Sequence, residues 1–260
     1  MDQGDGMTLP LAFLGSFGDA IDFIFRAREQ KAGGAQVGGL SQFGSLTWDH
    51  MKLSLAAMGV ACLISLPLGM WLGHKGRGGF LAINASNVGR AVPSFALIAF
   101  FAAYLGTGFT NVMLALVLLA IPPILTNAYV GIRQSDRDTV DSARGMGMTE
   151  GQIVRRVELP LAVPLIFGGI RTSMVNVVGT ATIAPLAGVS SLGDPIINVT
   201  TYGDAARLAA AIVVALLAVT TEFVLAGVQR AVTPRGLKLE KRRAGLWGRL
   251  PLINRREATT

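Results

Sequence analysis

Long apolar stretches separated by short polar segments dominate the hydropathy pattern of the chain. Residues 91–132 contain no charged side chain and would be about 60 Å long as a helix, enough for two crossings of a hydrocarbon core of about 30 Å. The glycines and polar residues of 106–111 mark the break between these crossings. We therefore expect membrane spans at 53–73, about 80–105, about 112–131, 161–187 and about 205–229. This pattern predicts an all-α integral membrane protein with five core spans.

Composition supports the membrane assignment, and the positive charges suggest an orientation. Hydrophobic residues make up 51% of the chain, charged residues 15%, and the mean hydropathy is +0.51. Residues 230–257 hold nine Lys or Arg and two Glu, which equals the formal net charge of +7. Basic residues beside a span favour the cytoplasmic side and contact with anionic lipid over a nucleic-acid site. The short basic segment 74–77 should face the same side, so we expect a cytoplasmic C-terminus.

The N-terminal region, 1–46, is expected to lie outside the membrane domain of 47–236, and 237–260 to form a basic tail. No basic segment opens the chain as in a cleaved leader peptide. Residues 9–25 are apolar but include Asp19 and Asp22, so they predict either an interfacial helix, which we favour, or a full span. Residues 31–45 are rich in Gly, Ser and Gln and are typical of a linker.

A polar segment, residues 132–160, separates the third and fourth spans and predicts two short helices. Ser135 with Asp138, and Thr149 with Gln152, each fit the capping box that satisfies the first N–H groups of a helix. Helices should therefore begin near 136 and 150. Gly145 and Gly147 allow a turn between them. The second helix should end near Leu159, because Pro160 cannot donate a backbone hydrogen bond.

The second of these helices has a small apolar face suited to a groove of another protein. Ile153, Val154 and Val157 form this face at helical spacing. Arg155, Arg156 and Glu158 are expected to stay in solvent. The small residues Ala143 and Gly145 would allow a partner surface to approach closely.

Within this segment the sequence resembles the inner-membrane permease subunits of binding-protein-dependent ABC importers. Their cytoplasmic signature is an acidic residue, two small residues, a glycine, and an aliphatic-any-Leu-Pro end at fixed spacing. The residues that match it are Asp141, Ser142, Ala143, Gly147, Val157, Leu159 and Pro160. Asp replaces the usual Glu, and Ser replaces the first Ala. Segments 89–97, 145–172 and 179–196 resemble the osmoprotectant branch, and the resemblance covers about 47–236.

This resemblance implies a type I importer permease whose polar segment, including Gly145, is the coupling helix that enters a cleft of a separate ATP-binding subunit. It further implies an extracytoplasmic substrate-binding protein and a second permease chain, identical or related, in a bacterial inner membrane. The solute would be glycine betaine, choline, carnitine or proline. An ABC permease for another small solute, such as an amino acid or methionine, is the alternative. A second alternative is a secondary transporter that works without an ATP-binding subunit.

The residues that carry chemistry in enzymes do not form a recognisable site in this sequence. No Gly-rich phosphate loop ends in Gly-Lys-Ser or Gly-Lys-Thr, so ATP hydrolysis is expected on another subunit. The two histidines, His50 and His74, lie at opposite ends of one span and cannot form a cluster. The one cysteine, Cys62, lies within an apolar stretch. No metal site, cofactor or catalytic residue is therefore predicted. We expect His50 to be a solvated polar residue.

Four residues within the spans are candidates for the translocation path. Arg90 and Pro93 interrupt the span of about 80–105, whose first part forms either a short cytoplasmic or re-entrant helix or the wall of a water-filled path. Arg171 is either a functional intramembrane charge or a residue that snorkels to the headgroups. Glu222 lies at a comparable depth, and we predict that Arg171 and Glu222 pair. The resembled family has a glycine pair at the positions of Ser190 and Ser191. This departure weakens the inference, by resemblance, that these residues take part in an extracellular gate.

Overall fold

The structure is a computed structural model, and it describes residues 8–30, 33–34, 36–80, 84 and 91–234. Within these residues the chain is almost entirely helical. The long helices are α2 (Gly39–Lys75), α5 (Phe109–Arg133), α8 (Leu159–Thr180) and α11 (Asp204–Val232). The shorter elements are α1 (Thr8–Phe25), β1 (Ala27–Glu29), β2 (Gln36–Gly38), α4 (Ser94–Leu105), α6 (Arg137–Gly145), α7 (Glu150–Ile153), the π-helical turn η1 (Val154–Glu158), the 3₁₀ turn η2 (Ala181–Ala187), α9 (Asp194–Ile197) and α10 (Val199–Tyr202).

Four helical stretches in the described part of the chain are long and apolar enough to cross a bilayer. They are Gly39–Lys75, Phe109–Arg133, Glu150–Ala187 and Asp204–Val232. Their outer faces carry large apolar side chains that would be unfavourable in water: Leu63 is 77% exposed and Phe223 is 72% exposed. The chain is therefore a multi-pass membrane protein, as the composition predicts.

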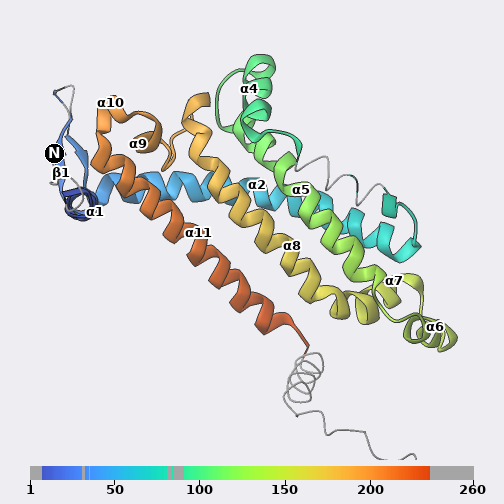
Figure 1. Cartoon of the computed structure of the whole chain (residues 1–260). Helices are drawn as coiled ribbons and strands as arrows, with labels where there is room; N and C mark the ends of the chain where they lie inside the picture. The colour runs from blue at the N-terminus through green and yellow to red at the C-terminus, as the bar shows by residue number, and fades with distance from the viewer. Residues whose placement is uncertain (1–7, 31–32, 35, 81–83, 85–90, 235–260) are drawn as a thin grey trace, which may run out of the picture.

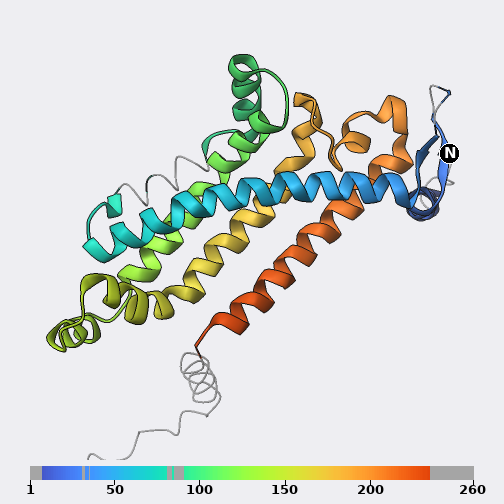
Figure 2. The same cartoon turned by 180° about the vertical axis from the view of Figure 1, so that it is seen from behind.

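Helices α2 and α8 pack against α5, and α11 packs against α8. In Figure 1, α11, α8 and α5 run side by side, and Figure 2 shows α2 crossing this row obliquely. Glycines allow the closest approaches: a Cβ on Gly69 of α2 would lie 2.8 Å from the Leu125 carbonyl oxygen, and one on Gly169 of α8 would lie 2.7 Å from the Pro123 carbonyl oxygen. Small residues at such contacts are typical of membrane helix packing, where close van der Waals contact stabilises the bundle.

The two ends of the bundle are different. Helices α6 and α7, with the turn that joins them, lie where α5 ends and α8 begins (Figure 1). We call residues 134–153 the elbow and this end of the bundle the elbow end. The short helices α9 and α10 lie at the opposite end, next to the β-hairpin (Figure 1). Residues 188–193 form a turn there: Gly188 adopts φ +73° after η2, and α9 then begins at Asp194.

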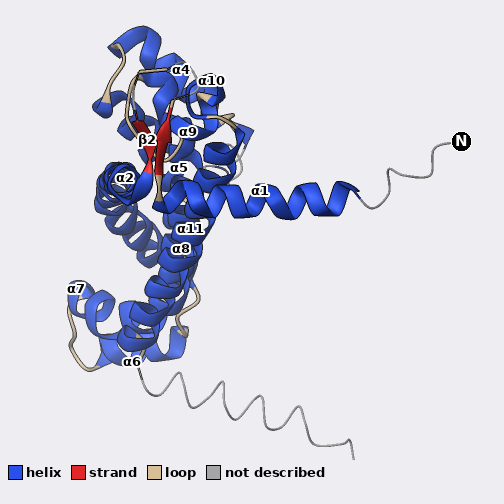
Figure 3. Cartoon of the chain, turned by 90° about the vertical axis from the view of Figure 1, so that its left-hand side faces the viewer, coloured by secondary structure: helices blue, strands red, loops and turns tan. Residues whose placement is uncertain are grey.

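The N-terminal region forms more structure than its composition suggests. Strand β1 pairs antiparallel with β2, so residues 36–45, expected within a linker, form β2 and the start of α2. The linker prediction was wrong there because Phe43 packs edge-on against Phe23 of α1, at 6.1 Å between ring centroids, and draws these residues into the fold. Figure 3 shows α1 projecting sideways from the bundle, across the direction of the long helices.

Two predicted spans differ from the structure. Helix α2 begins at Gly39, well before the expected residue 53, because buried residues such as Leu46 and His50 continue its packed face. The span expected at 80–105 is represented by α4, 12 residues long, which begins after Pro93 and is too short to cross a bilayer by itself. Arg90 lies outside the described residues.

His50 also differs from its expected role as a solvated residue. Its side chain is fully buried, and its Nε2 lies 2.9 Å from the Val178 carbonyl oxygen of α8. The hydrogen bond explains how a polar ring is accommodated between two spans, because it satisfies one ring nitrogen without water. His50 therefore links α2 to α8 and is part of the packed bundle.

Candidate functional site

The elbow is organised by its caps. Asp136, and not Ser135, caps α6: its side chain accepts a hydrogen bond from the Asp138 backbone N–H, at 3.1 Å. Ser135 does not serve as the cap, because its Oγ is buried and has no hydrogen-bond partner among the described residues. At α7 the expected capping box is confirmed. Thr149 accepts from the Gln152 N–H at 3.4 Å, and Gln152 accepts from the Thr149 N–H at 2.8 Å.

Gly147 makes the turn between the two helices. It adopts φ +81°, a left-handed conformation that costs an L-residue about 1–2 kcal/mol. The Gly147 N–H donates to the Arg144 carbonyl, and the Met148 N–H donates to the Ala143 carbonyl at 3.2 Å, which closes the end of α6. Gly145 is the last residue of α6, and its φ is not positive. The turn therefore requires a glycine at 147 but not at 145.

The helix that begins at α7 does not end at Pro160, so that prediction was wrong. The chain continues from α7 through η1 into α8 as one stretch, Glu150–Ala187. In η1 the Leu159 N–H donates to the Val154 carbonyl, five residues back, and this wider turn stands directly before Pro160. A proline lacks an N–H and its ring crowds the preceding turn. The π-helical turn accommodates both effects and joins the elbow to the fourth span.

The signature residues differ in exposure. Asp141, Ser142, Gly145 and Gly147 are exposed, and Val157, Leu159 and Pro160 are half-buried. Ala143 is only 2% exposed, so it packs within the chain and cannot offer a contact surface to a partner, contrary to expectation. Asp141 accepts a hydrogen bond from Arg144, at 2.9 Å. Hydrogen bonding to Glu150, with a smaller contribution from Asp141, raises the pKa of Arg144.

Hydrogen bonds anchor the elbow to α2. His74, near the end of α2, places its Nδ1 2.8 Å from Glu158 and its Nε2 2.9 Å from Glu150. Glu150 in turn accepts from Arg144 of α6, at 3.0 Å. The Glu158 side chain is 6% exposed and that of His74 is 9% exposed. The prediction that Glu158 stays in solvent was therefore wrong. These four residues, which we call the elbow network, tie α2, α6, α7 and η1 together.

A second candidate site lies on the face of α8 that the single chain leaves uncovered. Exposed or half-buried small and polar residues recur there at helical spacing: Gly168, Thr172, Val175, Asn176 and Gly179. The opposite face of α8 is buried and apolar, apart from Ser173, whose hydroxyl donates to the Ala120 carbonyl at 2.9 Å. Arg171 lies on the same face and is half-buried. A face of small, polar and charged residues fits water or another protein chain better than lipid.

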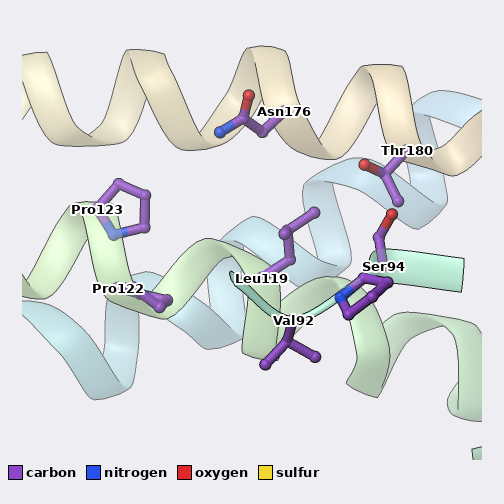
Figure 4. A pocket seen from close by; sticks show the side chains of 8 residues that line it. Val92, Ser94, Leu119, Pro122, Pro123, Asn176 and Thr180 are labelled. Carbon is purple, nitrogen blue, oxygen red and sulfur yellow. The ribbon is translucent and has the colours of Figure 1, made fainter. Parts of the chain in front are cut away.

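A hollow of 390 Å³ lies beside this face, between α4, α5 and α8. Figure 4 shows Asn176 and Thr180 reaching into it from α8, Ser94 from the start of α4, and Pro122 and Pro123 from α5. Pro93, a predicted path residue, is the residue before α4 and is part of this lining. We call it the proline hollow. No charged side chain lines it among the described residues.

Arg171 and Glu222 pair, as the sequence predicts. Arg171 Nε donates to Glu222 Oε1 at 2.9 Å, a second guanidinium nitrogen contacts the same oxygen, and Arg171 Nη1 donates to Gln229 at 2.8 Å. The pair joins α8 to α11, and each side chain is about one-third exposed, at 30% and 34%. With Asn176 it lines a second hollow, of 450 Å³, which we call the ion-pair hollow.

Comparison with known proteins decides the family. A family model described as the inner membrane component of binding-protein-dependent transport systems matches residues 65–237. The chain belongs to this family. The choline transport system permease protein OpuBB of Bacillus subtilis (strain 168) is 38% identical to it, over 74% of this chain and 89% of that protein.

Further relatives agree with this family, and a solved structure shares the fold. The carnitine transport permease protein OpuCB of Listeria monocytogenes is 36% identical, over 76% of this chain and 91% of that protein. The osmoprotectant import permease protein OsmW of Salmonella typhimurium is 32% identical, over 75% and 93%. A chain of the inward-facing MetNI methionine ABC transporter shares the fold, with a TM-score of 0.63 at 21% identity over 75% of this chain and 98% of that one.

Some residues of these sites were not found by sequence reasoning. His74 and Glu158 are 84 positions apart, and neither belongs to the signature, so nothing in a single sequence joins them. Asn176 and Thr180 had a usable signal: they are polar residues four apart in a largely apolar span, which places them on one helix face. Pro93, Arg171 and Glu222 were predicted as path candidates because charges and prolines stand out in a span, and the structure places them in the linings of the two hollows.

Proposed function

We propose that the chain is a translocation subunit of an ATP-driven importer for a small compatible solute such as glycine betaine, choline, carnitine or proline. The observation that carries this proposal is the elbow, a rigid and exposed pair of helices continuous with the fourth span. The relatives named for choline, carnitine and osmoprotectant transport support the solute class. In this proposal residues 47–236 form the membrane domain, and the sideways orientation of α1 supports an interfacial role for it.

The elbow is proposed to dock into a separate ATP-binding subunit on the cytoplasmic side. Its exposed surface is formed by Asp141, Ser142, Gly145, Met146 and Gly147, of which Met146 is 76% exposed. The helix from Glu150 to Ala187 continues from the elbow into the membrane and past both hollows. A displacement of the elbow by ATP binding would therefore move α8 directly, since no flexible loop intervenes to absorb it.

The polar face of α8 is proposed to line the solute path with a second permease chain, identical or related. The proline hollow is bounded by prolines, which hold fixed backbone angles, and by the side chains of Ser94, Asn176 and Thr180. These uncharged polar groups can contact a solute without trapping it, which a conducting path requires. An extracytoplasmic binding protein would deliver the solute at the opposite end of the bundle.

A reconstituted system tests this proposal. The chain is co-expressed with an ATP-binding subunit and a substrate-binding protein from its own genome and placed in proteoliposomes. We expect uptake of radiolabelled glycine betaine or choline that requires ATP on the elbow side and the binding protein on the other. The secondary-transporter alternative predicts uptake by the chain alone, driven by a sodium or proton gradient. Gradient-driven uptake without ATP would therefore overturn the proposal.

Orientation gives an independent prediction. In a variant with Cys62 replaced by Ala, single cysteines are introduced at the exposed positions Ser45 and Met146. A membrane-impermeant thiol reagent added to intact cells is expected to label Ser45→Cys and not Met146→Cys, because the basic residues Lys75 and Arg77 favour a cytoplasmic position for the elbow end. Labelling of Met146→Cys after lysis is the positive control. Labelling of that cysteine in intact cells would contradict the orientation.

A further inference from the structure

The two hollows on α8 are neighbours. Asn176 lines both the proline hollow and the ion-pair hollow, and the rest of the ion-pair hollow is formed by Gly168, Arg171, Thr172 and Val175 of α8 and by Glu222 of α11. Arg171 lies five residues from Asn176, about 7.5 Å along the helix axis. A solute in the proline hollow would therefore reach the ion pair by moving past Asn176.

The ion pair is accessible to a small molecule from the hollow beside it. About one-third of each side chain remains exposed, and the hollow of 450 Å³ is within the range of about 300–1,000 Å³ typical of small-molecule sites. Both contacts from Arg171 to Glu222 fall on one carboxylate oxygen, Oε1, so the guanidinium is not engaged in the parallel two-bond geometry that it forms with an ideally placed carboxylate.

Gln229 fixes the guanidinium independently of Glu222. It accepts from Arg171 Nη1 at 2.8 Å, and its own amide donates to the Pro164 carbonyl at 3.1 Å. Arg171 would therefore keep its place if Glu222 moved away. If Glu222 moved away by the width of a small molecule, the Arg171 guanidinium and the Glu222 carboxylate would together be complementary to a zwitterion. Such a solute carries a carboxylate for Arg171 and an ammonium group for Glu222.

We propose that the Arg171–Glu222 pair is a transient binding site for zwitterionic solutes in the path. The carboxylate of the solute replaces Glu222 on Arg171, and its quaternary ammonium group lies against the released Glu222 carboxylate. When the solute leaves, the pair re-forms, so neither charge stays unpaired in the membrane, where isolation costs about 3 kcal/mol or more. This inference rests on the proposed function and adds a selectivity to it: zwitterions are bound by both charges, cations such as choline by Glu222 alone.

Saturation-transfer NMR on the purified chain in nanodiscs tests binding without requiring transport. The probes are the methyl protons of glycine betaine and of choline, which share the trimethylammonium group and differ in the carboxylate. We expect Arg171→Gln to weaken glycine betaine binding about tenfold while choline binding is kept or strengthened, because Glu222 is freed. Glu222→Gln should do the reverse. Arg207→Gln, which removes an exposed arginine of α11 away from the hollow, is the matched control and should change neither.

The single variants leave one charge unpaired and could fail to fold, so the double variant Arg171→Gln/Glu222→Gln completes the test. It should remain folded by size-exclusion chromatography and lose the preference for glycine betaine over choline. Equal signals for the two solutes in the unmodified chain, or equal losses for both in each variant, would show that the pair is only structural. Failure of the proposed function is distinguishable, because the reconstituted importer would then take up neither solute with ATP.

Discussion

Gly147→Val is expected to abolish ATP-dependent solute uptake while leaving the membrane bundle folded. Gly147 is exposed, has no neighbouring atom within 4 Å of the Cβ position, and adopts φ +81°. A side chain there is thus prevented by the backbone conformation and not by crowding, and a β-branched residue is the least tolerant of it. The turn must change, and α7 then leaves its position relative to α6. The measurements are uptake in proteoliposomes and pull-down of the ATP-binding subunit.

Two matched variants separate the turn from the surface. Gly147→Asn should retain most uptake, because asparagine tolerates the left-handed region better than other residues with a side chain. Gly145→Ala adds a methyl group to the proposed docking surface, in open space and without positive φ, so the fold should be as stable or slightly more stable, and any loss of uptake would come from the surface. Normal uptake in Gly147→Val, with Gly145→Ala equally active, would show that the elbow does not transmit the ATPase cycle.

The comparison of these two glycines shows what the sequence could predict about the elbow. Local rules placed both helices, the Thr149–Gln152 cap and the turn, because each depends on residues within four positions of one another. They failed at Pro160, where a π-helical turn carries the helix through the proline. A helix tolerates a proline when the turn before it widens. Whether the turn widens depends on tertiary contacts of η1, such as that of Glu158 with His74 at the end of α2.

The fold as a whole was predictable where hydropathy alone determines it. Spans corresponding to α5 and α11 were placed within a few residues, since an uncharged stretch of suitable length has few alternatives in a bilayer. Residues 36–45 were misassigned because a Gly- and Ser-rich composition does not reveal that Phe43 packs on Phe23. The pairing of Arg171 with Glu222 was predictable from depth, because two isolated charges at similar depth gain from meeting.

The elbow network could not be predicted from the sequence, and its loss should have the second of the two largest effects on stability and uptake. Glu158 is a carboxylate at the membrane boundary that is 6% exposed, and His74 is its partner at 2.8 Å. Removing His74 leaves a buried carboxylate without this partner, which costs about 1–3 kcal/mol and more for a charged group. The same change releases Glu150 from α2, so the elbow loses its connection to the first span at two points.

His74→Leu is therefore expected to lower the thermal unfolding temperature of the purified chain and to reduce uptake severely. Glu158→Met alone should also lower the unfolding temperature, since Nδ1 of the buried imidazole then loses its partner while Nε2 keeps Glu150. The double variant His74→Leu/Glu158→Met replaces both polar groups by apolar ones and should recover most of the thermal stability, because neither side chain then requires a buried hydrogen bond. If uptake stays low in this stable double variant, the network also transmits motion from the elbow to α2. If the three variants lose stability additively, the His74–Glu158 contact contributes nothing to the fold.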